Sequence, residues 1–177
     1  MSDPEAPPRT RRDFLFGAIY AAGTGGALLS LLPLVETLAP AADTLALARI
    51  EIDLAPIAVG QAITVMWRGK PVFVRHRTAA EIAAARADDT AALRDPQTDA
   101  ERVLRPEWLV TIGTCTHLRC VPLGQKNGQP RGDHGGWFCP CHGSHYDTSG
   151  RVRKGPAPAN LAVPRYVFLD DTRIRIG

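Results

Sequence analysis

The sequence lacks three features, and each absence removes a class of protein. No cysteine occurs outside positions 115 to 141, so a disulfide framework along the whole chain is excluded. The formal net charge is only +3 and the basic residues are scattered, which argues against a nucleic-acid partner. No internal repeat is visible, which argues against a repeat architecture. What remains is an ordinary globular composition, and 177 residues suffice for one compact domain with an appendage.

One long apolar run lies near the N-terminus. Residues 14–35 carry no charge, and three arginines precede them within residues 9–12. As a helix the run would reach roughly 33 Å, close to the hydrocarbon thickness of a bilayer. We therefore expect residues 1–35 to hold a single-pass membrane anchor, although its glycines and Pro33 leave cleavage near 38–41 as an alternative. The arginines predict a cytoplasmic N-terminus in the bacterial inner membrane and a periplasmic head.

The segment TRRDFL at residues 10–15 resembles the twin-arginine export signal, whose machinery carries folded proteins. Paired arginines before an apolar run are common, so the motif alone is weak. A cofactor inserted in the cytoplasm would require export of a folded protein, because threading an unfolded chain would lose it.

Residues 36–47 are rich in alanine, and we expect a linker that is either a plain connector or a functional hinge. Beyond it, in residues 48–177, short runs with β-branched residues predict strands. These runs are 48–53, 62–67, 71–75, 108–112, 166–169 and 172–176. Breaks at 68–70 and 170–171 look like hairpin turns, which favours an antiparallel β domain.

Helical propensity in the head is clear only at residues 79–87, AAEIAAARA. The polar stretch that follows, as far as position 106, is predicted to be an irregular surface excursion with few constraints.

Residues suited to chemistry gather in two segments, CTHLRC at 115–120 and CPCHGS at 139–144. Four cysteines are compatible with two disulfides, with tetrahedral zinc, or with metal ligands plus one disulfide. Cys115 and His117 lie only two positions apart, closer than ligand pairs of structural zinc usually do, which disfavours zinc. Thiolates and imidazoles together also suit an iron–sulfur cluster in which two histidines replace two cysteines.

The pattern Cys-X-His followed by Cys-X-X-His resembles that of the Rieske iron–sulfur family. The string CPCHGSHYDTSGRVRKGPAP, residues 139–158, is similar to the Rieske subunits of proteobacterial and mitochondrial quinol–cytochrome c reductases. The resemblance implies an all-β fold: a transmembrane helix and an antiparallel β-sandwich head. It also implies an inserted cluster-binding subdomain at about 113–158.

The resemblance further implies one 2Fe–2S cluster per chain. Cys115 and Cys139 would hold one iron, and His117 and His142 the other. Two neutral imidazoles in place of two thiolates make the cluster easier to reduce, towards roughly −150 to +300 mV. Such a high potential is what a quinol oxidant needs.

The other two cysteines, Cys120 and Cys141, lie one in each ligand segment. The resemblance implies a disulfide between them; the alternative is two inert buried thiols. Ser144 and Tyr146 match positions that donate hydrogen bonds to a bridging sulfide and to a ligand cysteine sulfur in the family. Taken without the resemblance, they would be a turn serine and a core tyrosine.

Residues Gly155, Pro156, Ala157 and Pro158 resemble the family's proline loop, a stiff third segment over the cluster. With Leu118 they would form the apolar docking surface. Arg119 departs from the family, which usually has glycine there. A loop that needs positive φ at this position would be strained by arginine.

The remaining histidines and tryptophans have simpler expected roles. His76, His134 and His145 lack metal-ligand spacing and are expected at the surface or in turns. Trp67, Trp108 and Trp137 are expected to be core aromatic residues rather than cofactor contacts.

The function that the resemblance implies is oxidation of ubiquinol and reduction of a c-type cytochrome. The chain would act within a dimeric complex in the lipid membrane, beside cytochrome b and c-type cytochrome subunits. Quinol would donate a hydrogen bond to His142, then give up one electron and one proton, and the head would swing about the linker. One alternative is the Rieske small subunit of a periplasmic oxidase such as arsenite oxidase. A second is a structural zinc module without a redox role.

Overall fold

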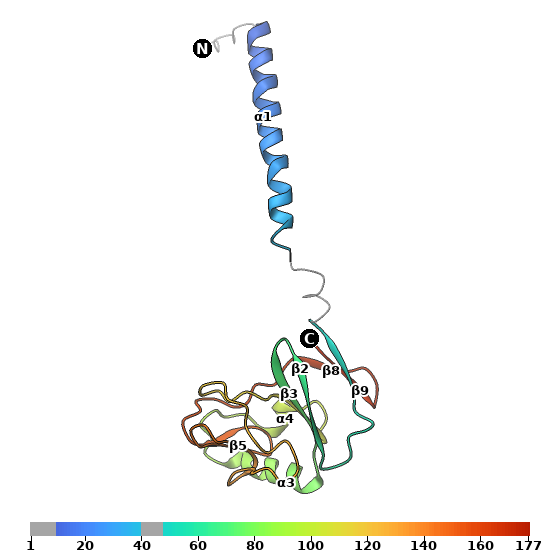
Figure 1. Cartoon of the computed structure of the whole chain (residues 1–177), viewed down its shortest axis with the longest axis vertical. Helices are drawn as coiled ribbons and strands as arrows, with labels where there is room; N and C mark the ends of the chain where they lie inside the picture. The colour runs from blue at the N-terminus through green and yellow to red at the C-terminus, as the bar shows by residue number, and fades with distance from the viewer. Residues whose placement is uncertain (1–9, 40–47) are drawn as a thin grey trace, which may run out of the picture. The chain divides into compact units, whose positions relative to one another are not determined.

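A computed structural model describes residues 10–39 and 48–177 (Figure 1). The chain divides into two units, Met1–Leu45 and Ala46–Gly177, and each is described by itself. Most of the predicted linker, 36–47, lies outside the described residues, as does part of the possible cleavage segment, 38–41.

The N-terminal unit contains helix α1, Arg11–Glu36. Its N-terminus is a capping box: the Thr10 hydroxyl accepts from the Asp13 backbone N–H, and the Asp13 carboxylate accepts from the Thr10 N–H at 2.8 Å. The 26 residues extend about 39 Å, and none of them is buried. Within the described residues α1 is the one helix that is long and apolar enough to span a membrane.

Two three-stranded antiparallel sheets form the base of the head, with orders β1-β9-β8 and β2-β3-β4. Their strands are β1 Ile50–Asp53, β2 Ala62–Trp67, β3 Lys70–His76, β4 Trp108–Ile112, β8 Tyr166–Phe168 and β9 Arg173–Ile176. The two sheets share one core that contains Ile174 of β9, Val74 of β3 and Val110 of β4. This packing of apolar faces confirms the predicted antiparallel, all-β head.

The predicted strands at 62–67 and 108–112 have the observed bounds, and the other four differ by one or two residues at one or both ends. The turn between β2 and β3 is a two-residue connection, because Trp67 pairs with Lys70. Arg68 and Gly69 have φ of 49° and 70°, as a type I′ hairpin turn requires.

A third antiparallel sheet, of order β5-β6-β7, was not predicted from the sequence. Its strands are β5 Gly135–Cys139, β6 Ser144–Asp147 and β7 Val152–Lys154. The register shifts between Gly135 and Trp137, and again between His145 and Tyr146. These irregularities interrupt the alternation that makes a strand recognisable in a sequence.

The predicted helix at 79–87 is α3, Ala79–Ala87, capped by Thr78 and Glu81. The prediction of an irregular surface excursion for the next residues, up to 106, is confirmed in part, since most of them are exposed or half-buried and lie outside regular elements. They include η1, Asp88–Thr90, and α4, Asp99–Arg102, however, and the Asp99 and Arg102 side chains are buried. The reason is electrostatic: these polar side chains are partners of buried charges in the head, so they face inward.

The buried charges form a connected network. Arg77 contacts Asp99 at 2.6 Å, and Asp99 also accepts a hydrogen bond from the Ser149 hydroxyl at 2.7 Å. Arg151 pairs with Asp147 at 2.7 Å and with Asp89 of η1. Because buried charges need partners, this network fixes the 79–106 segment against the β5-β6-β7 sheet.

Candidate metal centre

Two tight loops present the predicted ligands. The first follows β4, and its turn is closed by backbone hydrogen bonds from Cys115 N to Cys120 O, at 2.7 Å, and from Arg119 N to Cys115 O, at 3.0 Å. The second joins β5 to β6, and Gly143 N donates to Cys139 O at 3.0 Å. An antiparallel hairpin therefore positions the second loop beside the first.

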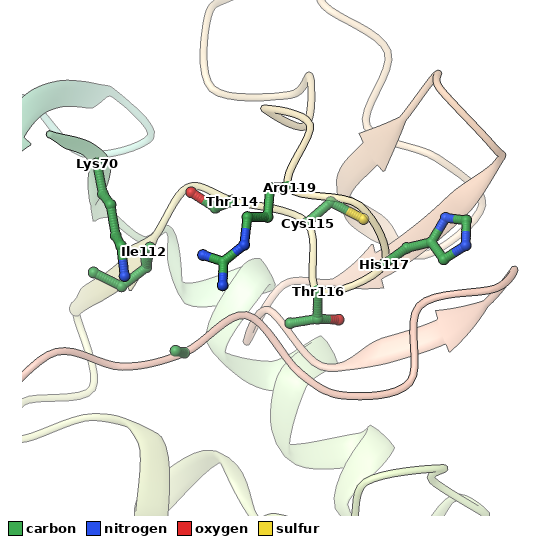
Figure 2. Close-up of a pocket in the computed structure, with 8 residues that line it drawn as sticks. Lys70, Ile112, Thr114, Cys115, Thr116, His117 and Arg119 are labelled. Atoms are coloured by element: carbon green, nitrogen blue, oxygen red, sulfur yellow. The ribbon is translucent and has the colours of Figure 1, made fainter.

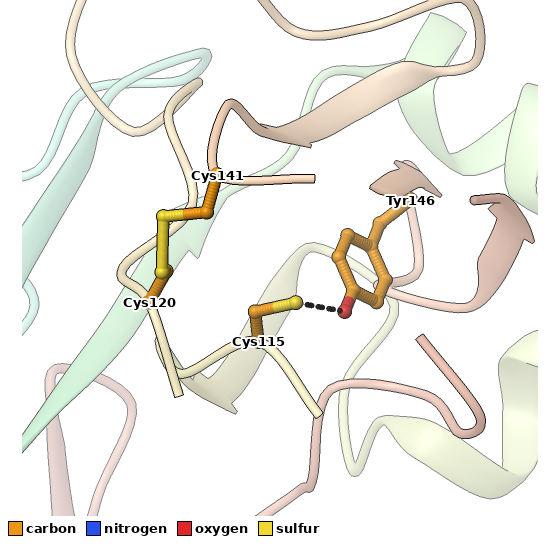
Figure 3. The surroundings of a disulfide bond; sticks show 4 residues. All are labelled: Cys115, Cys120, Cys141 and Tyr146. Carbon is orange, nitrogen blue, oxygen red and sulfur yellow. Dashed lines mark hydrogen bonds between the residues drawn. A yellow bond between two sulfur atoms is a disulfide. The ribbon is translucent and has the colours of Figure 1, made fainter. Parts of the chain in front are cut away.

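The structure separates the four cysteines into two kinds. Cys120 and Cys141 are joined by a disulfide that links the two loops (Figure 3). Cys115 and Cys139 are free and buried, with 1% and 2% of their surface exposed. Two thiols therefore remain available to a metal.

The rings of His117 and His142 lie edge to face, with centroids 4.7 Å apart. His142 is exposed, whereas His117 is half-buried. Nδ1 of His117 is buried and has no hydrogen-bond partner within residues 10–39 and 48–177. Buried polar atoms are rarely left unpaired, and a neutral imidazole nitrogen is a metal ligand. The two loops thus carry two free thiols and two neighbouring imidazoles, a donor set that fits a Rieske cluster.

The sulfur atoms of Cys120, Cys139 and Cys141 lie within 4.8 Å of one another. Two of these sulfurs already form the disulfide, and only thiolates bind metals well. We therefore prefer the four residues of the two Cys-His motifs as candidate ligands.

Comparison with known proteins gives the same cofactor. Residues 57–166 match the family model described as the Rieske [2Fe-2S] domain. This chain belongs to the Rieske iron–sulfur family. Its cofactor is a 2Fe–2S cluster of the Rieske type, which rules out the structural zinc module.

The N-terminal residues of this Rieske protein also match a family model. Residues 1–41 match the model described as the twin-arginine (TAT) signal of the ubiquinol–cytochrome c reductase Fe-S subunit. Together with the apolar helix α1, this match fits a single-pass membrane anchor.

Similar proteins cover nearly the whole Rieske chain. It is 63% identical to the ubiquinol–cytochrome c reductase iron–sulfur subunit of Rhodospirillum rubrum, over 95% of this chain and 92% of that protein. It is 51% identical to the mitochondrial Rieske subunit of the cytochrome b-c1 complex of Neurospora crassa, over 98% and 74%. A solved chain of a hyperthermophilic respiratory Complex III matches with a TM-score of 0.54, 26% identity, and coverage of 89% and 96%. These relatives support the quinol-oxidising assignment rather than the arsenite oxidase alternative.

Tyr146 and Ser144 lie on β6, and Ser144 pairs with the candidate ligand Cys139 of β5 in the sheet. The Tyr146 hydroxyl donates to Cys115 Sγ at 3.2 Å (Figure 3). Burial raises the pKa of Tyr146 above its ordinary value, so the phenol keeps the proton that it donates. Burial would also raise the pKa of Cys115, but hydrogen bonds, with that from Tyr146 foremost, outweigh burial and lower it.

The proline loop packs directly on the second ligand loop. Gly155 has φ of 90°, and a Cβ there would lie 2.3 Å from the carbonyl oxygen of Gly143, so only glycine fits. Ala157 N donates to Ser144 Oγ at 3.1 Å. The Ala157 side chain is fully buried, which corrects the prediction that it belongs to the docking surface. It faces the interior because its backbone is bonded to Ser144.

The sequence analysis missed two residues near the candidate ligand loops, Thr116 and Val121. The Thr116 hydroxyl, inside the first ligand motif, donates to Ala159 O at 2.6 Å and so joins the proline loop to the first ligand loop. Val121 is 53% exposed, next to Leu118 at 64%. An apolar residue directly after Cys120 was the signal available for Val121. The Thr116 contact depends on the fold, and no sequence signal predicts it.

Arg119 has φ of 65°, which lies in the left-handed region. The strain that the sequence analysis expected for arginine at this position is therefore present. Its side chain and that of Lys70 extend toward the same cavity of about 370 Å³, beside the first ligand loop (Figure 2). The sulfur of Cys115 and the ring of His117 point away from Arg119 (Figure 2). Arg119 therefore lies on the far side of the loop from the ligand atoms.

The residues with simpler expected roles follow the predictions in part. Trp108 and Trp137 are core residues, and Trp67 packs at the core edge. His134 lies in a turn, but the other two histidines lie in strands. His76 stacks on Trp108 with centroids 4.0 Å apart, and His145 Nδ1 accepts from Asp133 N.

Proposed function

We propose that this chain oxidises ubiquinol through its Rieske cluster and passes the electron to a c-type cytochrome, within a ubiquinol–cytochrome c reductase. The observation that carries the proposal is a contrast in exposure: Cys115 and Cys139 are buried, whereas His142 is exposed. Buried thiols keep water away from the sulfur ligands. An exposed imidazole is the part of the site that a bound quinol can reach. The names of the similar subunits support the same activity.

In this proposal Cys115 and Cys139 hold one iron, and His117 and His142 the other. When bound, the cluster accepts one electron at high potential, because two neutral imidazoles replace two charged thiolates. Ser144 and Tyr146 raise that potential further, since their hydroxyl protons stabilise negative charge on sulfur. The Cys120–Cys141 disulfide holds the two ligand loops together.

His142 is the proposed catalytic residue. Its exposed ring accepts a hydrogen bond from a quinol hydroxyl and takes up that proton as the quinol loses one electron. Histidine suits this role because one ring nitrogen can bind the metal while the other gives up and regains a proton, and a bound metal ion makes that proton easier to lose. Proton and electron uptake are then coupled, and the potential depends on pH.

The docking surface of the proposal consists of Leu118, Val121, Pro156 and Pro158, all exposed, and the backbone of Gly155. An apolar patch around His142 would seat the head against a membrane subunit that holds the quinol. The same patch would then contact a c-type cytochrome, after the head moves about the linker, residues 36–47.

The proposed location is the bacterial inner membrane. The N-terminus lies in the cytoplasm, helix α1 spans the bilayer, and the head, residues 48–177, is periplasmic. The basic residues before α1 support this orientation. The proposed partners are cytochrome b, a c-type cytochrome and membrane lipid, in a dimeric complex.

Low-temperature electron paramagnetic resonance (EPR) of dithionite-reduced membranes tests the proposal. A rhombic signal of a mixed cysteine–histidine 2Fe–2S cluster is expected. The potential of the purified protein should fall as the pH rises between about 6 and 10. A potential that stays flat over this range contradicts the coupling at His142. Ubiquinol-dependent reduction of cytochrome c should be lost in His142→Ala but retained in His76→Ala.

A further inference from the structure

The polar segment between η1 and α4 reaches across to the proline loop. Nη1 of Arg94 donates to two carbonyl oxygens, those of Gly155 and Ala157, each at 2.6 Å. Both carbonyls belong to the proline loop. Arg94 therefore contacts the loop on either side of Pro156. Both acceptors are backbone carbonyl oxygens, so the contact does not depend on the loop's side chains.

The next residue extends the contact beyond the far end of the loop. The Asp95 carboxylate accepts from Asn160 N at 2.9 Å, and the Asp95 carbonyl accepts from Asn160 Nδ2 at 2.9 Å. Asn160 in turn accepts from Val152 N of β7, at 2.9 Å. Arg94 thus binds the proline loop, and Asp95 binds Asn160, two positions after the loop ends.

This segment is itself anchored in the buried interior. Gln97 O accepts from Arg151 Nη1 at 3.0 Å, and Gln97 Oε1 accepts from Arg102 Nη1 at 2.5 Å. The Arg151 side chain is fully buried, and Arg102 is 3% exposed. A donor carried on an anchored segment can impose a position on the loop that it contacts.

The proline loop is connected to the cluster site through Ser144. Ala157 donates its N–H to Ser144 Oγ at 3.1 Å, while its own carbonyl accepts from Arg94. A hydroxyl that accepts a hydrogen bond directs its own proton elsewhere. The peptide groups on both sides of Ala157 therefore join Arg94 to the orientation of the Ser144 hydroxyl.

We infer that Arg94 is a positioning residue, which holds the proline loop so that Ala157 N–H orients the Ser144 hydroxyl toward the cluster. The inference rests on the proposed function, because it assigns Ser144 a part in setting the potential. Arg94 pairs with no carboxylate within residues 10–39 and 48–177, so its donors serve carbonyl groups. The guanidinium suits this task because its donors are rigid, planar and permanently charged.

The first test measures the loop directly, by amide hydrogen exchange of residues 155–161 in the full-length, cluster-loaded protein. In Arg94→Ala, exchange at Ala157 should quicken on the order of tenfold, since a charge-assisted hydrogen bond is lost. Arg94→Lys, which keeps one charged donor group, should restore part of the protection. Arg86→Ala removes an equal charge from the exposed face of α3 and should leave the exchange unchanged.

The second test asks whether Arg94 acts through Ser144. The cluster potential is measured by EPR titration in Arg94→Ala, Ser144→Ala and the double variant. If Arg94 acts by orienting Ser144, the Arg94→Ala shift should fall to less than about half in the Ser144→Ala background. A charge acting through space would give the same shift in both backgrounds and would overturn the inference.

Unchanged exchange in Arg94→Ala, or equal acceleration in Arg86→Ala, would also overturn it. The two proposals fail separately. Absence of a Rieske signal in the wild-type protein would contradict the proposed function, whereas the exchange measurement does not depend on the assignment of the ligands.

Discussion

The hydroxyl of Tyr146 donates a hydrogen bond to the sulfur of Cys115, at 3.2 Å, inside a fully buried environment. Tyr146 comes from β6 and Cys115 from the loop after β4, so the fold brings together residues from separate sheets. The bond favours negative charge on sulfur, and reduction of the cluster increases that charge. With Cys115 as a cluster ligand, as proposed above, a donor at this position makes reduction easier.

Removal of this donor should lower the potential. In Tyr146→Phe we expect a decrease of roughly 60 to 130 mV, which corresponds to about 1.5 to 3 kcal/mol for a hydrogen bond to a charged group. EPR-monitored redox titration measures the shift. Tyr166→Phe, in the base core and bonded to Leu104 N, is the matched control and should leave the potential unchanged. An unaltered potential in Tyr146→Phe would contradict the role.

Loss of the disulfide should destabilise the cluster site. Cys120 and Cys141 are 21 positions apart in the sequence, and closing a loop of this size stabilises a fold by about 3 kcal/mol. We expect the Cys120→Ser, Cys141→Ser double variant to lose its visible absorbance at a lower temperature than wild type. When the wild type is reduced with a phosphine, its disulfide is broken, and it should lose its visible absorbance at the same temperature as the double variant. Equal midpoints in oxidised samples would contradict a stabilising disulfide.

Arg119→Gly should stabilise the head. The arginine has φ of 65°, and a residue with Cβ in the left-handed region costs about 1 kcal/mol relative to glycine. The expected rise in thermal midpoint is roughly 3 °C. Arg119→Ala removes the charge but keeps the backbone strain, so its midpoint should not rise. A similar rise in both variants would show that charge, rather than strain, sets the effect.

Asp99 should give the head part of its acid sensitivity. Burial would raise the pKa of Asp99, but hydrogen bonds from Arg77 and Ser149 outweigh burial and hold it below the ordinary value. A lowered folded-state pKa contributes stability above the unfolded-state pKa, about 3.9, and this is lost as the pH falls below it. Asp99→Asn should therefore cost about 3 to 5 kcal/mol at pH 7, because Arg77 is left without its partner.

The free energy of unfolding, measured from pH 7 down to pH 3, checks this expectation. The difference between wild type and Asp99→Asn should shrink below about pH 4. Asp171→Asn is the control, because its partner Arg105 is at the surface and the Asp171 side chain is 94% exposed. Its cost should stay below about 1 kcal/mol. A constant difference across this pH range would contradict the assignment.

The strands of the base could be predicted, whereas the β5-β6-β7 sheet could not. Strands β2 and β4 show β-branched and aromatic residues beside clear turn residues. Strand β5 begins Gly135-Gly136, and the register shifts on both sides of β6. Its β-forming residues, which are Trp137, Phe138, Tyr146 and Val152, are few and lie among glycine and polar residues, so no run long enough to predict a strand results.

In the segment from 88 to 106 the sequence predicted a largely exposed excursion but not its buried contacts. Its polar composition indicated a solvent-exposed loop, yet Asp99 is 1% exposed and Arg94 contacts the proline loop. Polar residues are usually exposed, and a charged side chain is buried only where the interior supplies a partner for it. Arg77 and Ser149, the partners of Asp99, are distant in the sequence, so no local pattern could reveal them.

The sequence by itself determined the chemistry: which side chains are thiols and imidazoles, at what spacing, and behind which apolar anchor. Those facts depend on residue identity and on short-range geometry, which the order of amino acids specifies. Only the tertiary structure decided that Thr116 bonds Ala159, that Ala157 faces inward, and that Arg94 bonds the proline loop. These contacts link positions far apart in the chain, so their geometry exists only once the sheets and loops of the head have packed together.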